Sequence, residues 1–153
     1  MRTITFDELP ELIGQELAVG DWVLIDQARI DRFAEATGDH QWIHVDAARA
    51  AAGPYGRTIA HGFLTLSLLP LLLRSAFTIE SSLTINYGLN GVRFPSPVPV
   101  DSRVRGRFAL KGLQALPPIE GRDGYQVTMT MTIELDGSTK PACVAESVTR
   151  RYR

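Results

Sequence analysis

The sequence has little of several features that mark common classes of protein. It has a single cysteine, Cys143, which cannot form a disulfide within the chain, so we expect a reducing compartment, the cytoplasm. Its 16 Lys and Arg residues nearly balance its 17 Asp and Glu residues, which disfavours nucleic acid or an anionic membrane surface as a partner. Residues 1–10 carry acidic side chains where a secretory signal peptide would have its apolar region.

A long hydrophobic run is also missing. The most apolar segment, residues 62–77, is shorter than the roughly 20 apolar residues that a membrane-spanning helix needs, and Pro70 and Arg74 interrupt it. We therefore expect no membrane span and predict a helix that is buried on all sides within the protein. Pro70 should bend this helix or remove one backbone hydrogen bond, at a cost of about 3 kcal/mol unless packing compensates.

The length of the chain and the pattern after this helix predict the fold class. The 153 residues suffice for one domain with a sizeable core and are too few for two ordinary domains, so we assign residues 1–153 to one domain. After the helix, apolar and polar side chains alternate with the period of half-buried strands. The predicted strands cover 82–87, 91–94, 103–111, 126–135 and 141–152, with an irregular link at 95–99 and a hairpin turn at Asp136-Gly137. An antiparallel sheet wrapped around the helix is an α+β architecture.

One predicted strand carries a stripe of positive charge, formed by Arg103, Arg105, Arg107 and Lys111. Such a stripe is more often a solvated face than a phosphate or ligand site, and we favour solvation here.

Two helices are expected to flank a short polar loop. Asp26 suits the N-cap of a helix over residues 27–37, because its side chain can accept from unpaired backbone N–H groups. Gly38 should end this helix in the left-handed conformation. Asp46 should cap a second short helix over residues 47–50. The loop between them is therefore held by a rigid helix end on either side.

This loop contains an aspartate and a histidine, Asp39 and His44. A carboxylate and an imidazole placed together can hold one water molecule and move its protons, which is the equipment for adding or removing water. For an arbitrary pair at this spacing, a cap and an ordinary partly buried histidine would be the commoner outcome. A zinc site formed by Asp39, His40, His44 and Asp46 is a weaker alternative, and we expect no metal.

The motifs together resemble those of the MaoC-like dehydratases with a hotdog fold, the family of (R)-specific enoyl-CoA hydratases. The matching pieces are Phe-Ala-Glu-Ala-Thr-Gly-Asp at 33–39, His44, and Ile-Ala-His-Gly at 59–62. The segments 38–46 and 85–90 are most similar to the branch of nodulation protein N and of the small mycobacterial 3-hydroxyacyl-thioester dehydratases. The resemblance covers nearly the whole chain and implies an antiparallel hotdog sheet around a central helix.

The resemblance also implies roles for individual residues. Asp39 and His44 would bind the water that adds to C3 of a trans-2-enoyl thioester, giving the (3R)-hydroxyacyl product. The backbone N–H of Gly62 would stabilise the enolate oxygen, because it begins a helix and no Cβ stands in the way. The residues expected to support the loop or contact the ligand are His61, Trp42, Asn86, Asn90 and Arg93.

The sequence departs from the family pattern at one place in this loop. Many members have Asn-Pro where this chain has Gln41-Trp42. The spacing from Asp39 to His44 is unchanged, so we expect the pair to survive. Trp42 would then reshape the substrate pocket or, as is commoner for a loop tryptophan, anchor the loop by packing.

The resemblance implies an acyl-CoA or acyl-carrier-protein thioester as substrate, no cofactor, and a homodimer in which exposed strand edges pair. Two alternatives stay open. The first is a hotdog acyl-CoA thioesterase, in which a carboxylate activates water toward the thioester carbonyl. The second is a non-catalytic partner that binds acyl thioesters.

Overall fold

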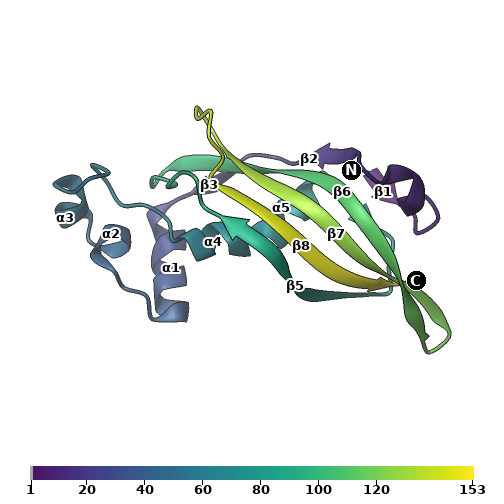
Figure 1. Cartoon of the computed structure of the whole chain (residues 1–153). Coiled ribbons are helices and arrows are strands. Elements are labelled where there is room, and N and C mark those ends of the chain that lie inside the picture. The colour runs from purple at the N-terminus through teal and green to yellow at the C-terminus, as the bar shows by residue number, and fades with distance from the viewer. Residues whose placement is uncertain (1) are drawn as a thin grey trace.

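A computed structural model describes residues 2–153 of the chain (Figure 1). Its elements, in chain order, are β1 (Arg2–Ile4), the 3-10 helix η1 (Leu9–Leu12), β2 (Glu16–Val19), β3 (Val23–Ile25), α1 (Gln27–Thr37), α2 (Trp42–Val45), α3 (Ala47–Ala51), α4 (Gly62–Ser67), α5 (Leu69–Ala76), β4 (Phe77–Ile79), β5 (Leu83–Arg93), β6 (Ser102–Ile119), β7 (Arg122–Leu135) and β8 (Cys143–Tyr152). A six-stranded sheet has the order β2-β6-β7-β8-β5, and β3 also pairs with β6. Its pairings are all antiparallel, and the helices pack beside it, so the α+β prediction is confirmed.

The long strands β6 and β7 follow directly from the alternation in the sequence. On β7, Met129 and Ile133 are fully buried while the threonines between the apolar residues are half-buried. The two strands run beyond the predicted ends and join through Glu120 and Gly121, both with positive φ (51° and 76°). A two-residue turn of this hand matches the natural twist of paired strands.

The region 82–94 differs from the prediction of two short strands. It forms one strand, β5, which pairs with β8 along its whole length. The register of this pairing shifts between Asn86 and Gly88 and again between Leu89 and Gly91. The strand continues across these irregularities, where the prediction had placed a break between two strands. The irregular link at 95–99 is confirmed, apart from one isolated bridge between Ile59 and Pro99.

The apolar segment 62–77 also differs in part from its prediction. It forms two helices, α4 and α5, with Leu68 between them. Pro70 lies in the first turn of α5, where a backbone N–H would have no helical partner, so the expected energetic cost is wrong. Burial on all sides is wrong too, because Phe63 is 70% exposed and Leu71 is 36% exposed. No helix of the described residues is long and apolar enough to cross a membrane.

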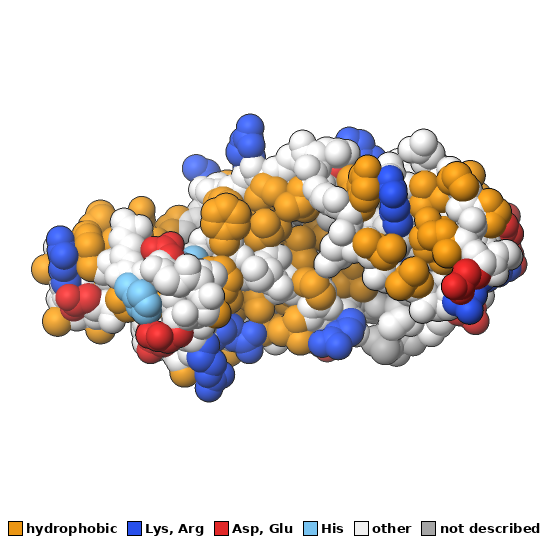
Figure 2. Space-filling view, turned by 90° about the horizontal axis from the view of Figure 1, so that it is seen from below, with side chains coloured by type: hydrophobic (Ala, Val, Ile, Leu, Met, Phe, Trp, Pro, Cys, Tyr) orange, Lys and Arg blue, Asp and Glu red, His pale blue; other side chains and the backbone are white. Residues whose placement is uncertain are grey.

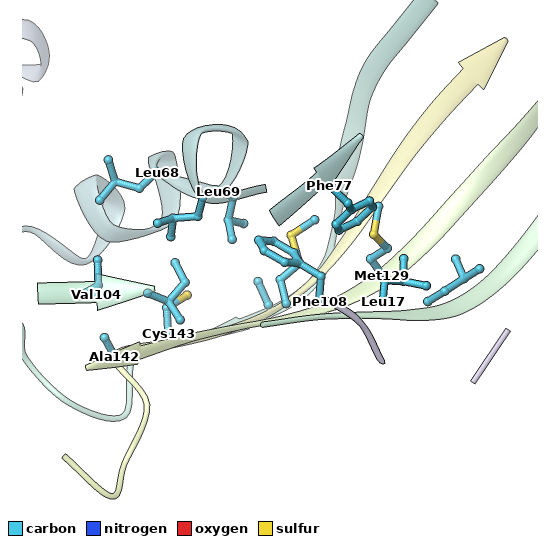
Figure 3. Close-up of a cluster of buried hydrophobic side chains, with 14 of the residues drawn as sticks. Leu17, Leu68, Leu69, Phe77, Val104, Phe108, Met129, Ala142 and Cys143 are labelled. Atoms are coloured by element: carbon cyan, nitrogen blue, oxygen red, sulfur yellow. The ribbon is translucent and has the colours of Figure 1, made fainter. Parts of the chain in front are cut away.

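The core lies between these helices and the inner face of the sheet. Figure 3 shows Leu68 and Leu69 above the sheet, with Phe77 and Phe108 farther along. The two phenylalanine rings meet edge to face at 5.8 Å. Gly106 lets α5 approach the sheet, because a Cβ there would lie 3.1 Å from Cβ of Leu72 and closer still to the ring of Phe108.

The positive stripe on β6 is a solvated, charge-paired face, as predicted. Arg103 bonds Asp136 at 2.6 Å, and Arg105 bonds Glu134 at 2.6 Å. Arg107 reaches Glu134 and also Glu16, and Lys111 pairs with Glu146.

Candidate active site

The helices at one end of the sheet form the frame of the site (Figure 1). Asp26 caps α1 by accepting from the backbone N–H of Arg29 at 2.8 Å, and Gly38 ends it with φ of 74°. Asp46 caps α3 by accepting from the backbone N–H of Arg49 at 2.9 Å. These three predictions are confirmed, so the loop between α1 and α3 has fixed ends.

The histidine of the loop lies inside the protein, and the aspartate lies at its surface. His44 is on the short helix α2 and is 6% exposed, whereas the side chain of Asp39 is 54% exposed. The Nδ1–H of His44 donates to the carbonyl of Ile59 at 2.7 Å, which leaves Nε2 as an acceptor. A carboxylate oxygen of Asp39 and ring nitrogens of His44 and His61 lie within 4.8 Å of one another. One water molecule can bridge a gap of this size through two hydrogen bonds.

The environment of His44 favours its neutral form. Burial lowers the pKa of His44 below its ordinary value of 6.5, and the nearby His61 lowers that pKa further. The hydrogen bond to Ile59 and the charge of Asp39 oppose this fall in pKa without reversing it. A neutral imidazole with a free Nε2 can accept a proton from water at neutral pH.

His61 forms the wall behind this pair. Its ring stacks on that of His44 with centroids 3.7 Å apart, and Phe33 contacts its ring with centroids 5.0 Å apart. The Nε2–H of His61 donates to the backbone carbonyl of Asp39 at 2.9 Å. His61 therefore contacts both members of the pair. Its Nδ1 is buried and has no hydrogen-bond partner among the described residues.

Two polar residues that the sequence did not single out hold the loop in place. Gln27 donates from Nε2 to the backbone carbonyl of His44 at 2.8 Å and accepts from the hydroxyl of the buried Thr58 at 2.6 Å. Because Gln27 lies on α1 and Thr58 lies just before Ile59, this bridge links the helix, the loop and the segment that leads to α4. No local pattern marks either residue, since their partners are 17 and 31 positions away.

Gly62 begins α4, as predicted, and His61 is the residue before it. A Cβ on Gly62 would lie 3.1 Å from the ring of Phe94. The absence of a side chain at this position therefore makes room for the ring of Phe94. It also leaves the backbone of Gly62 open to a ligand. In the first turn of a helix the backbone N–H has no helical acceptor, so that of Gly62 is available to a bound group.

The structure gives Trp42 a packing contact. Its ring lies against Gly53, where a Cβ would come within 2.9 Å, and the guanidinium of Arg49 stacks on it at 4.5 Å. The four-residue zinc alternative is not assembled. His40 turns toward Glu35 at 3.8 Å, and the carboxylate of Asp46 is used as a helix cap.

The three predicted residues of β5 have other partners or surroundings within the described chain. Asn90 donates to Glu146 at 2.6 Å, and Arg93 donates to the carbonyl of Val92 at 2.7 Å. Asn86 lines a groove that runs between α4–α5 and the strands β5 and β8. None of the three forms a hydrogen bond or ion pair with Asp39, His44 or His61 in the part of the chain that the structure describes.

This groove has a volume of about 850 Å³. The helices contribute Leu66, Leu69 and Leu73, and the sheet contributes Leu89 and Met131. Figure 2 shows hydrophobic side chains gathered along the middle of the face where the molecule is hollowed. Among the described residues that line the groove, Asp39, His44, His61 and Gly62 do not appear. Helix α4 links the site to the groove, with Gly62 at its start and Leu66 one turn later.

Comparison with known proteins gives consistent matches. The family model of the MaoC like domain matches residues 8–131. The chain is 53% identical to 3-hydroxyacyl-thioester dehydratase Z of Mycobacterium tuberculosis, over 95% of this chain and 97% of that protein. It is 45% identical to nodulation protein N of Rhizobium leguminosarum, over 97% of this chain and 92% of that protein.

A solved structure matches the fold as well. An R-hydratase from Pseudomonas aeruginosa in its unliganded form aligns with a TM-score of 0.69 and 24% identity, covering 95% of this chain and 88% of that chain. This likeness confirms the predicted hotdog fold, in which an antiparallel sheet wraps a central helix.

Proposed function

Because the chain belongs to the MaoC-like dehydratase family, we propose that it catalyses the reversible hydration of a trans-2-enoyl thioester to the (3R)-3-hydroxyacyl thioester. The observation that carries this proposal is the pair of Asp39 and the neutral His44, separated by a gap that one water molecule can bridge. The relatives support the substrate class, since one of them is named as a 3-hydroxyacyl-thioester dehydratase.

In the hydration direction, the two side chains bind one water molecule between them. Nε2 of His44 accepts one proton as the water oxygen forms a bond to C3 of the enoyl chain. The electron pair of the double bond moves to the thioester oxygen as an enolate. The enolate then collapses and takes a proton at C2 from the pair of Asp39 and His44, which returns the proton that His44 accepted, so the elements of one water are added. General acid–base help of this kind typically contributes about 10² to 10⁴ in rate.

The enolate oxygen needs a donor, and the backbone N–H of Gly62 is the candidate. It starts α4 directly after His61, whose ring stacks on His44, so it lies beside the proposed water site. Removing one donor of this kind from an active site can cost about 10²-fold or more in rate.

The acyl chain of the substrate would lie in the groove along α4 and α5, and its thioester would be carried by CoA or by acyl carrier protein. In this proposal the reaction uses no cofactor and no metal, and residues 1–153 act as one domain.

A second copy of the chain would pair with the free edge of β5, giving a homodimer. Among residues 2–153 only β8 pairs with β5, and all but one of the eleven residues of β5 are exposed. Among them Leu83, Ile85, Tyr87 and Leu89 are each more than 40% exposed. An unpaired edge with this much apolar surface favours pairing with another strand.

The test is to mix the purified protein with trans-2-enoyl-CoAs of four to about sixteen carbons and follow the absorbance of the conjugated thioester. We expect the absorbance to fall without release of free thiol, and chiral analysis to give the (3R) product. Release of thiol would instead identify a thioesterase, and binding without either change would identify a non-catalytic partner. Because Asp39, His44 and His61 could hold a divalent cation, a chelator is added in parallel, and we expect the rate to be unchanged.

A further inference from the structure

Arg151, on β8, is a buried positive charge without an acidic partner. It is 7% exposed, and none of the ion pairs within residues 2–153 includes it. Within the described part of the chain its guanidinium donates only to neutral hydroxyls, those of Ser81 at 3.4 Å and Thr84 at 3.2 Å, and its Nε has no partner. A buried charge is normally paired, because removing it from water is costly. An acceptor that completes this site is therefore to be expected.

Arg151 lines the groove, and the end of the groove where it lies is polar. On the same face of β8, Ser147 and Thr149 are also buried, and the hydroxyl of Thr149 has no hydrogen-bond partner. Arg74, at the end of α5, lines the groove as a second cation. No aspartate or glutamate of the described chain lines it. This end of the groove therefore offers several donors and two positive charges, and it lacks an anion.

The polar end lies far from the proposed reaction site. Phe94, which touches Gly62, follows the last residue of β5, whereas Thr84, which touches Arg151, is near its first residue. Along the helices, Gly62 and Arg74 are twelve residues apart, which corresponds to at most roughly 18 Å because α4 and α5 are separated at Leu68. The wall between the two ends is largely apolar and includes Leu66, Leu69 and Leu73. A ligand that fits this groove has an apolar middle and an anionic far end.

We propose that the acyl thioester bound in this groove carries a carboxylate at its far end, and that Arg151 binds this carboxylate. The proposal rests on the proposed function, because it places the thioester at Asp39, His44 and Gly62. It adds a substrate class, the thioesters of dicarboxylic acids. The guanidinium presents a fork of donors that matches a carboxylate, and Thr149 adds a hydroxyl beside it.

The experiment compares pairs of trans-2-enoyl-CoAs with equal carbon number, one ending in a methyl group and the other in a carboxylate. The series covers chains of about eight to about sixteen carbons. The distance between the reaction site and Arg151 should favour one chain length, at which the terminal carboxylate reaches the guanidinium. At that length we expect kcat/KM to favour the carboxylate by about tenfold or more. Arg151→Met should reverse this preference, and Arg151→Lys should keep part of it.

The matched control is Arg150→Met. Arg150 is the neighbouring residue of β8, its side chain stacks on Tyr87, and it does not line the groove. This variant should keep the preference of the parent protein. Circular dichroism of each variant checks that the fold is intact, and the Lys variant preserves the test if Arg151→Met does not fold.

Binding of saturated acyl-CoAs separates this inference from the proposed function. If enoyl-CoAs are hydrated with no preference at any length, or if Arg151→Met keeps the preference, the carboxylate site is wrong while the hydratase stands. If a saturated acyl-CoA with a terminal carboxylate binds more tightly than its methyl-ended partner, and this advantage needs Arg151, the inference holds even when no hydration occurs. If no enoyl-CoA is hydrated and neither saturated compound binds, both proposals fail.

Discussion

The two side chains of the proposed pair differ in burial, and this difference suits them to different roles. Burial lowers the pKa of His44, and His61 lowers that pKa further. The hydrogen bond to the carbonyl of Ile59 holds the ring of His44 in one tautomer. Asp39 is half-exposed and can meet both the substrate and the solvent. A fixed neutral acceptor beside a solvent-exposed carboxylate suits the positioning of a water molecule.

This difference predicts how activity depends on pH. As the pH falls through the lowered pKa of His44, Nε2 gains a proton and can no longer accept one from water. The value of kcat/KM for hydration should therefore fall on the acid side, with its midpoint below 6.5. The measurement is the pH profile of initial rates at low substrate concentration. A limb centred above 6.5 would contradict the lowered pKa of His44. A rate that does not fall at any acid pH at which the protein stays folded would show that a neutral His44 is not required.

The residues of the site differ in how far local sequence patterns predict them. Asp39 and His44 are five positions apart between two capped helices, so local signals place them together. Gln27, Thr58 and Arg151 meet their partners across long separations and carry no local pattern. Folding alone brings them to the loop and to the groove, so the sequence did not predict their contribution.

The paired helices α4 and α5 are the element on which the site and groove depend. Pro70 begins a new helix within one apolar segment, and the segment keeps a buried face toward the sheet and an exposed face outward. Composition alone suggested burial all round, because it does not show which face of the helix the sheet leaves uncovered.

Adjacent leucines of α5 provide a test of this orientation. Leu72 is fully buried against the sheet, whereas Leu71 is 36% exposed. We expect Leu72→Ala to lower the free energy of unfolding by about 2 to 5 kcal/mol, because it leaves a cavity in the core. Leu71→Ala should lower it by less than about 1 kcal/mol. Urea unfolding followed by circular dichroism measures both, and equal losses would contradict the placement of α5.

The strands were predicted correctly where apolar and polar residues alternate without interruption. They were predicted wrongly where the register of strand pairing shifts. On β7 each apolar residue faces the core, so the period of two is unbroken. On β5 two register shifts and two glycines, Gly88 and Gly91, interrupt the period, which made one strand resemble two. The short strands β1, β2 and β3 were not predicted. They depend on pairing with distant partners, β1 with β4 and the other two with β6.

At the scale of the whole molecule, the free edge of β5 determines how copies of the chain would assemble. The opposite edge of the sheet is formed by the short strands β2 and β3, which both pair with β6, while the long strand β5 has no partner on its outer side among residues 2–153. Pairing there would also cover one side of the groove, so assembly and substrate binding would be linked.

This assembly predicts the effect of one charge on the edge. Ile85 is 41% exposed on β5, and Ile85→Lys would bring like charges together across a two-fold pair of strands. We expect the dissociation constant of the dimer to rise by about tenfold or more, measured by light scattering over a range of concentrations. Ile119→Lys, with 43% exposure at the tip of β6, is the control and should leave the dimer unchanged. A monomeric parent protein would contradict this assembly.

The most direct test of the proposed chemistry is the hydration rate of a trans-2-enoyl-CoA with Asp39→Asn and with His44→Gln. Each variant should keep the fold and lose about 10² to 10⁴ in kcat. Asp46→Asn and His40→Gln, changes of the same kind in the same loop, should keep the parent rate, because Asn still caps a helix and His40 faces Glu35. Full turnover by Asp39→Asn or by His44→Gln would show that this residue does not act on the water.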